Sequence, residues 1–120
     1  MKIILTTSGT DLNAPLDPRF GRAAGYLLYD LETSTYKRLD NESAQGTSHG
    51  AGILAAELVA RSGAKALITG HCGPKAFRVL NAAGVKVYNC DAVTVAEALE
   101  RYRAGKLVEA EGADVSGHWE

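Results

Sequence analysis

Short apolar runs alternate with glycine-terminated segments through the second half of the chain, and this alternation constrains the fold most strongly. The runs KALITG and VKVYNC have the character of buried strands. The segments before, between and after them show the spacing of helices and end at Gly63, Gly84 and Gly105. Strands separated by helices are expected to lie parallel and to be joined by right-handed crossovers, as in an α/β protein.

Each of the three expected helices has a start signal. Ser48 is placed to cap a helix over HGAGILAAELVARS. Pro74 suits the first position of a helix over PKAFRVLNAA, where its missing N–H has no partner to lose. Thr94 and Glu97 fit a capping box that opens VAEALERYRA. The second half is therefore predicted to run helix, strand, helix, strand, helix.

The first half holds three strand-like runs and one long loop. KIILTT has the pattern of a buried strand, and GYLLYD and TYKRLD form a predicted strand pair joined by the turn LETS. The loop SGTDLNAPLDPRFGRA is long for a compact domain, and long ordered loops are often functional. The three strands should form a meander whose middle strand is antiparallel. The whole chain is thus predicted to be a five-stranded mixed sheet, with one antiparallel strand and flanking helices.

Size and composition predict one soluble domain that spans residues 1–107, followed by a C-terminal tail of residues 108–120. The 120 residues are 46% hydrophobic with a net charge of −1, which does not favour a nucleic-acid partner. The two cysteines form no CxxC pair, which argues against a disulfide scaffold or a zinc ribbon. We find no signal peptide and no stretch near the about 20 apolar residues of a membrane span. A cytoplasmic protein without membrane contact is expected.

The predicted topology brings several chemically active residues to one edge of the sheet. Four strands should point the same way, and open α/β sheets bind ligands at the carboxyl edge of such strands. The cofactor-binding residues expected there are Arg19, Phe20, Arg22, Ser48, His49, Gly50, Gly70, His71, Cys72 and Gly73, with both cysteines, Cys72 and Cys90, converging. Helix N-termini, arginines and closely approaching glycine backbone favour an anionic ligand. A thiol at a helix N-terminus also suits a soft metal.

Plainer interpretations remain open for these side chains. Cys72 can be a small buried hydrophobic residue, and Cys90 is more readily structural. Phe20 can plug the long loop onto the core as well as line a site. An enzyme is poorly supported, because the chain has no G-x-S-x-G elbow, no phosphate-binding loop and no carboxylate on its first strand. A nucleophile pair of Cys72 with a histidine is the enzymatic alternative that stays open.

Two segments resemble the dinitrogenase iron–molybdenum cofactor biosynthesis family. They are LDPRFGRAAGYLLYD and SHGAGILAAELVARSGAKALITGHCGPKAFRVLNAAGVKVY, and the likeness extends over roughly 1–107. The resemblance implies a ribonuclease H-like fold and a small accessory protein that binds or carries a metal–sulfur cluster. The segment APLDPRFGRA and the loop bearing Cys72 are most similar to members with a mixed molybdenum–copper sulfide cluster, which are associated with P-loop ATPases linked to cell division.

The resemblance also implies how such a cluster would be held. The arginines and helix N-termini would hold the charge of the anionic cluster, and Cys72, His71 and His49 would be the metal ligands. The first hypothesis is therefore a non-enzymatic carrier of a molybdenum–copper–sulfide cluster. The alternatives are a cofactor-free regulatory or interaction module of a P-loop ATPase system, and a thiol enzyme that uses Cys72.

Overall fold

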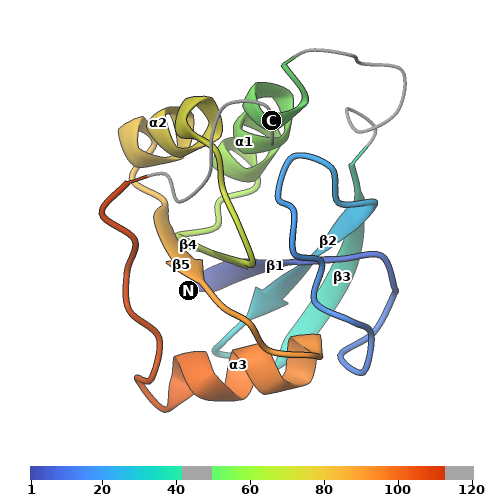
Figure 1. Ribbon diagram of the computed structural model, residues 1–120. Coiled ribbons are helices and arrows are strands. Elements are labelled where there is room, and N and C mark those ends of the chain that lie inside the picture. Colours follow the sequence, from blue (N-terminus) through green and yellow to red (C-terminus); the bar gives the residue numbers. More distant parts are fainter. Residues whose placement is uncertain (42–49, 113–120) are drawn as a thin grey trace.

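The computed structural model describes residues 1–41 and 50–112 and has three layers (Figure 1). In chain order the elements are β1 (Lys2–Thr7), β2 (Gly25–Asp30), β3 (Thr35–Asp40), α1 (Ala51–Arg61), β4 (Ala66–Thr69), α2 (Pro74–Ala82), β5 (Lys86–Asn89) and α3 (Val95–Arg103). Helices α1 and α2 lie on one face of the sheet, and α3 lies on the other (Figure 1). The predicted order of strands and helices is confirmed.

The five strands form one mixed sheet in the order β3-β2-β1-β4-β5. Strand β2 is antiparallel to both of its neighbours, whereas β1, β4 and β5 are parallel. Leu5 at the centre of the sheet is paired with Leu27 on one side and with Ile68 on the other. The five-stranded mixed sheet with one antiparallel strand is therefore as predicted, and the carboxyl ends of β1, β4 and β5 share one edge.

Two apolar clusters hold the layers together, one on each face of the sheet. The strand period of two sends Ile4 toward α1 and α2, and sends Ile3 and Leu5 toward α3. Val59 and Leu80 complete the first cluster from the helices. Burial of a large aliphatic side chain contributes about 1.5–3 kcal/mol relative to exposure, so these clusters are the main source of stability.

The helix ends follow local rules, with one exception. Pro74 is the first residue of α2, and Thr94 accepts a hydrogen bond of 3.1 Å from the Glu97 N–H. The three predicted stop glycines all have positive φ angles, between 70° and 86°. Helix α1, however, begins at Ala51 with Gly50 as its N-cap residue, so the predicted Ser48 cap is wrong. The left-handed φ of 77° at Gly50 interrupts helical geometry there, and Ser48 lies outside the described residues.

Beyond α3, the chain returns to the edge of the sheet. The Ala110 N–H donates a hydrogen bond of 2.7 Å to the Val87 carbonyl, and Glu109 forms a bridge with Tyr88. The first described residues of the predicted tail thus cover part of the β5 edge, and a domain boundary at residue 107 stays a prediction. Within residues 1–41 and 50–112, no helix has the length and apolar character needed to cross a bilayer.

Candidate functional site

The long loop after β1 folds over the carboxyl edge of the sheet and is tied to it by threonines. Thr6 Oγ1 donates to the Asp17 carbonyl at 2.8 Å, and Thr7 Oγ1 donates to the Pro15 carbonyl at 2.7 Å. Thr6 Oγ1 also lies 2.9 Å from Thr69 Oγ1, which joins β1 to β4 at the same level. Because these hydroxyls are buried, the loop is held in one position rather than free in solvent.

The arginine-bearing part of this loop lies against the turn that precedes α2. Arg19 forms a parallel bridge with His71, and the Phe20 N–H donates to the His71 carbonyl at 3.1 Å. The Asp17 carboxylate accepts a hydrogen bond of 2.9 Å from the Arg19 backbone N–H. The structure therefore brings Arg19 and Phe20 together with His71, although they are far apart in sequence.

Glycines allow this loop to approach two helix starts. A Cβ added to Gly70 would lie 2.5 Å from the Pro18 Cα, and one added to Gly21 would lie 2.9 Å from the Gly52 Cα. Both distances are too short for a real side chain, so only glycine fits. In this structure the two glycines allow two segments of the same chain to come into close contact. The sequence instead predicted that glycine backbone such as Gly70 would allow a ligand to approach closely.

The starts of α1 and α2 differ electrostatically from the start of α3. Neither α1 nor α2 has a side-chain cap hydrogen bond or an acidic residue in its first turn, whereas α3 has both. The positive ends of the α1 and α2 dipoles are thus not offset by a side-chain cap or by an acidic residue of the first turn. Arg19 is exposed and Arg22 half-buried on the loop between them. The site therefore favours a negative charge.

The thiols are buried on opposite faces of the sheet. Cys72 is 2% exposed and packs in the cluster under α1 and α2, together with Phe20, also 2% exposed. Cys90 belongs to the cluster under α3, where its Sγ lies 4.0 Å from Arg101 Nη1. The predicted convergence of both cysteines is wrong, because the two side chains point to different faces where their strands end.

The predicted metal ligands are only partly placed by the structure. His71 is exposed and lines a cavity of about 960 Å³ that Cys90 and Arg101 also line. Within residues 1–41 and 50–112, no three side chains of His, Cys, Asp or Glu are grouped to hold a metal ion. His49 and Ser48 lie outside the described residues. The described part of the chain thus offers charge and backbone donors rather than a closed set of ligands.

Two residues of the site were missed from the sequence. Asn41 is 2% exposed, and its side-chain amide donates to the carbonyls of Gly21 and Ala23 at 3.3 and 2.9 Å, which braces the loop from the end of β3. Tyr26 is fully buried, and its hydroxyl has no hydrogen-bond partner among the described residues. The available signals were an asparagine directly after the strand TYKRLD for Asn41, and a tyrosine inside the apolar run GYLLYD for Tyr26.

Burial also changes the titration of Tyr26. Loss of solvation raises the pKa of its hydroxyl above the ordinary value, and the Asp17 carboxylate adds to the rise. The Tyr26 ring lies 5.9 Å from the ring of Phe20, so this neutral hydroxyl sits beneath the loop that carries the arginines. A buried hydroxyl without a partner is a donor that a ligand or a water molecule can satisfy.

Comparison with known proteins assigns the family. A family model described as dinitrogenase iron-molybdenum cofactor matches residues 1–105. The chain belongs to this family. The resemblance noted in the sequence is therefore confirmed over nearly its whole expected length.

Solved structures and one curated relative are similar to the chain over most of its length. The apo form of the orange protein from Desulfovibrio gigas is 44% identical, with a TM-score of 0.92 over 95% of this chain and 96% of that one. The NMR structure of a candidate NifB protein from Thermotoga is 32% identical, with a TM-score of 0.79 over 92% and 98%. An uncharacterized protein of Methanocaldococcus jannaschii is 31% identical over 97 residues, which are 79% of this chain and 82% of that protein.

Proposed function

We propose that this family member is a non-enzymatic binder and carrier of an anionic metal–sulfur cluster. The observation that carries the proposal is the pair of uncapped helix starts, α1 and α2, on either side of a braced loop with Arg19 and Arg22. Such N-termini attract anions through the positive end of the helix dipole, and arginine adds charge-assisted hydrogen bonds. The 44% identity to the orange protein supports the same function.

The described residues fit a cluster that is held by charge better than one held by thiolates. Cys72 is 2% exposed, so its sulfur would reach a bound cluster only after the loop carrying Phe20 moved. The Tyr26 hydroxyl, buried without a described partner, could donate a hydrogen bond to a sulfide or oxygen atom after the same movement. The same burial counts against a thiol enzyme, because its nucleophile would have to be reached by substrate.

The finer identity of the cargo and of the partner rests on the family resemblance. It favours a mixed molybdenum–copper sulfide cluster, with Cys72, His71 and His49 as candidate ligands of a soft copper centre. It also favours a P-loop ATPase of the cell-division type as protein partner, a cytoplasmic location and a ribonuclease H-like fold. The strand order β3-β2-β1-β4-β5 with β2 antiparallel supports the last of these.

Titration of the metal-free protein with tetrathiomolybdate, alone and with copper(I), tests the function. We expect a saturable change in visible absorbance that weakens as salt is added. The double variant Arg19→Ala/Arg22→Ala should bind roughly 10- to 150-fold more weakly, because a lost charge-assisted contact costs about 1.5–3 kcal/mol. The double variant Arg61→Ala/Lys65→Ala removes two exposed positive charges at the other end of α1 and is the matched control. Wild-type affinity in the double variant would remove these arginines from the site, and absence of any binding would refute the proposal.

A further inference from the structure

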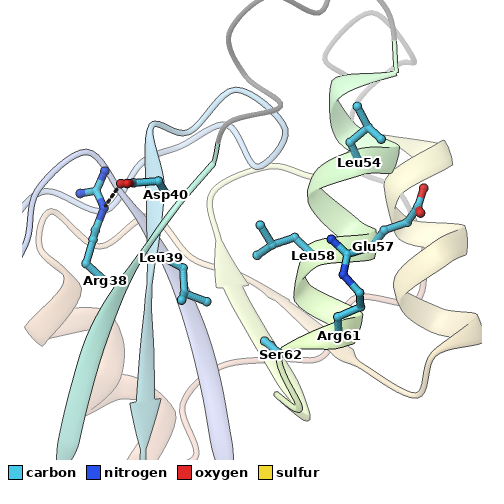
Figure 2. Close-up of a pocket in the computed structure, with 8 residues that line it drawn as sticks. All are labelled: Arg38, Leu39, Asp40, Leu54, Glu57, Leu58, Arg61 and Ser62. Atoms are coloured by element: carbon cyan, nitrogen blue, oxygen red, sulfur yellow. Dashed lines mark ion pairs between the residues drawn. The ribbon is translucent and has the colours of Figure 1, made fainter.

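A groove lies between β3 and α1, and it shares no lining residue with the site at the carboxyl edge. This β3–α1 groove has a volume of about 680 Å³. Its lining residues are Arg38, Leu39, Asp40, Leu54, Glu57, Leu58, Arg61 and Ser62 (Figure 2). A smaller hollow of about 220 Å³, lined in part by Leu28, Thr35 and Lys37, lies further along the same face of β3. Among residues 1–41 and 50–112, no element covers the sheet beside α1 at this place.

The groove has an apolar floor and one helical wall. Leu39 and Leu58 point toward each other across the floor, whereas Arg38 points away and pairs with Asp40 at 3.3 Å (Figure 2). The wall consists of the α1 residues at i, i+3, i+4 and i+7, namely Leu54, Glu57, Leu58 and Arg61. Leu54 is 44% exposed, which leaves apolar surface open to solvent. Residues at this spacing form the face that a helix presents to a neighbouring helix.

We propose that the β3–α1 groove docks an amphipathic helix of a partner protein, antiparallel to α1. Sheets in α/β proteins are covered by a layer of helices, and in the part of the chain that the structure describes no helix fills that layer over the groove next to α1. A docked helix would place an apolar stripe over Leu39, Leu54 and Leu58, as in other helix-in-groove complexes. The proposal does not depend on the metal–sulfur function, because the two surfaces share no residue.

The charges on the wall specify the partner helix. Glu57 and Arg61 are exposed, and neither makes an ion pair within the part of the chain that the structure describes. They are one turn apart, so a complementary helix carries glutamate against Arg61 and lysine against Glu57. In the antiparallel direction the glutamate precedes the lysine by four residues. That order also stabilises the partner helix itself.

A second copy of this chain is a poorer occupant than a different protein. If two copies packed their α1 helices in parallel about a two-fold axis, Glu57 would face Glu57 of the copy, and Arg61 would face Arg61. If the helices were antiparallel with the axis normal to the sheet, the sheet of the copy would occupy the place of β2 and β3. Like charges in one arrangement and steric overlap in the other therefore favour a heterologous partner.

Two capped helical peptides of about 15 residues test the proposal. Both carry leucines at i, i+4 and i+7; the matched peptide has glutamate followed four residues later by lysine, and the swapped peptide exchanges these two. The matched peptide should bind the wild-type protein about tenfold more tightly, because two attractive pairs become two repulsive ones. The double variant Glu57→Lys/Arg61→Glu should reverse this preference. NMR titration should place the shifted amide signals at Leu39, Leu54 and Leu58.

Two further variants test whether binding occurs in the groove. Leu54→Glu should abolish binding of both peptides, whereas Val93→Glu, at an apolar residue 75% exposed and outside the groove, should leave it unchanged. Circular dichroism verifies that each variant is folded. Failure of the matched peptide to bind, equal affinity for the two peptides, or an unreversed preference in the double variant would overturn the proposal. Self-association in sedimentation equilibrium that Leu54→Glu removes would assign the groove to a second copy and overturn it equally.

Discussion

At the scale of single residues, the candidate site is defined as much by bracing groups as by groups that could touch a ligand. Asn41 and Thr6 hold the loop by its backbone, and Phe20 anchors it in the core. This leaves Arg19 exposed on a rigid support, and a charge held in place loses little entropy when an anion binds. Tyr26 differs from these residues, because its buried hydroxyl has no described partner.

Replacement of Tyr26 tests whether this hydroxyl is truly unpaired. A buried polar group without a partner costs about 1–3 kcal/mol, so Tyr26→Phe should raise the free energy of unfolding by about 1 kcal/mol. Tyr29→Phe is the control, because Arg103 Nη2 donates to the Tyr29 hydroxyl at 2.9 Å, and its loss should lower the free energy of unfolding by a similar amount. Urea denaturation measures both. A stability loss in Tyr26→Phe would mean that a buried water or another group satisfies the hydroxyl.

The same replacement should change the pH dependence of stability. Because burial raises the Tyr26 pKa, the unfolded chain loses this proton near pH 10 while the folded chain keeps it. The contribution of Tyr26 is therefore fully present below about pH 10, and it falls as the pH rises further. Tyr26→Phe should lose stability less steeply than the wild type between about pH 9.5 and 11. Parallel curves for the two proteins would contradict the raised pKa.

At the scale of elements, the N-terminus of α3 differs from the N-termini of α1 and α2. The cap of α3 stabilises the helix, whereas the uncapped N-termini of α1 and α2 belong to the candidate site. Helix α3 has a complete local cap, with Thr94 bonded to the Glu97 N–H and the Glu97 carboxylate bonded to the Val93 N–H at 2.9 Å. Helices α1 and α2 begin at Gly50 and Gly73 without a side-chain cap. Neither start carries an acidic side chain, so the positive ends of both helix dipoles lie next to the loop that bears Arg19 and Arg22 without a local counter-charge.

Removal of the α3 cap should cost stability without affecting the site. Thr94→Ala should lower the free energy of unfolding by about 1 kcal/mol, because the Glu97 N–H loses its acceptor. Thr10→Ala, at an exposed position in the long loop, is the matched control and should change stability by less than about 0.5 kcal/mol. Urea denaturation compares the two variants, and tetrathiomolybdate titration should give wild-type affinity for both. A Thr94→Ala protein as stable as the control would show that the cap contributes little.

At the scale of the whole molecule, the two faces of the sheet are covered differently. The α3 face holds its own apolar cluster, Glu109 and Ala110 pair with the β5 edge, and the cavity lined by His71 and Arg101 lies beside them. The α1–α2 face carries the arginine loop at one edge and the β3–α1 groove beside α1. A cargo site and a docking groove on the same face of a small carrier would let a partner helix bind while the arginine loop stays accessible.

The fold should not need a metal. Both apolar clusters are built from side chains of the strands and helices, and no closed set of metal ligands is found among the described residues. The protein stripped of metal by chelation should therefore give a native α/β circular dichroism spectrum and a cooperative thermal melt, unlike domains that fold only around zinc. A random-coil spectrum after chelation would contradict this expectation.

The sequence by itself determined the order of the elements and the topology of the sheet. Apolar period, stop glycines, Pro74 and the Thr94–Glu97 box are local signals, because they depend on backbone conformation over a few residues. The antiparallel pairing of β2 with β3 followed from the short LETS turn between them, and the expected meander placed β2 between β1 and β3. The meeting of Arg19 with His71 could likewise be predicted, since parallel strands place their carboxyl ends at one edge.

Only the tertiary structure decided which faces and which segments meet. It placed Cys72 and Cys90 on opposite faces, turned Gly70 and Gly21 toward other parts of the chain, and brought Asn41 under the loop. It also left Tyr26 without a described partner and opened the groove beside α1. The physical reason is that burial and contact depend on packing between residues distant in sequence, and no local pattern specifies which of two sheet faces a residue beyond a strand end will join.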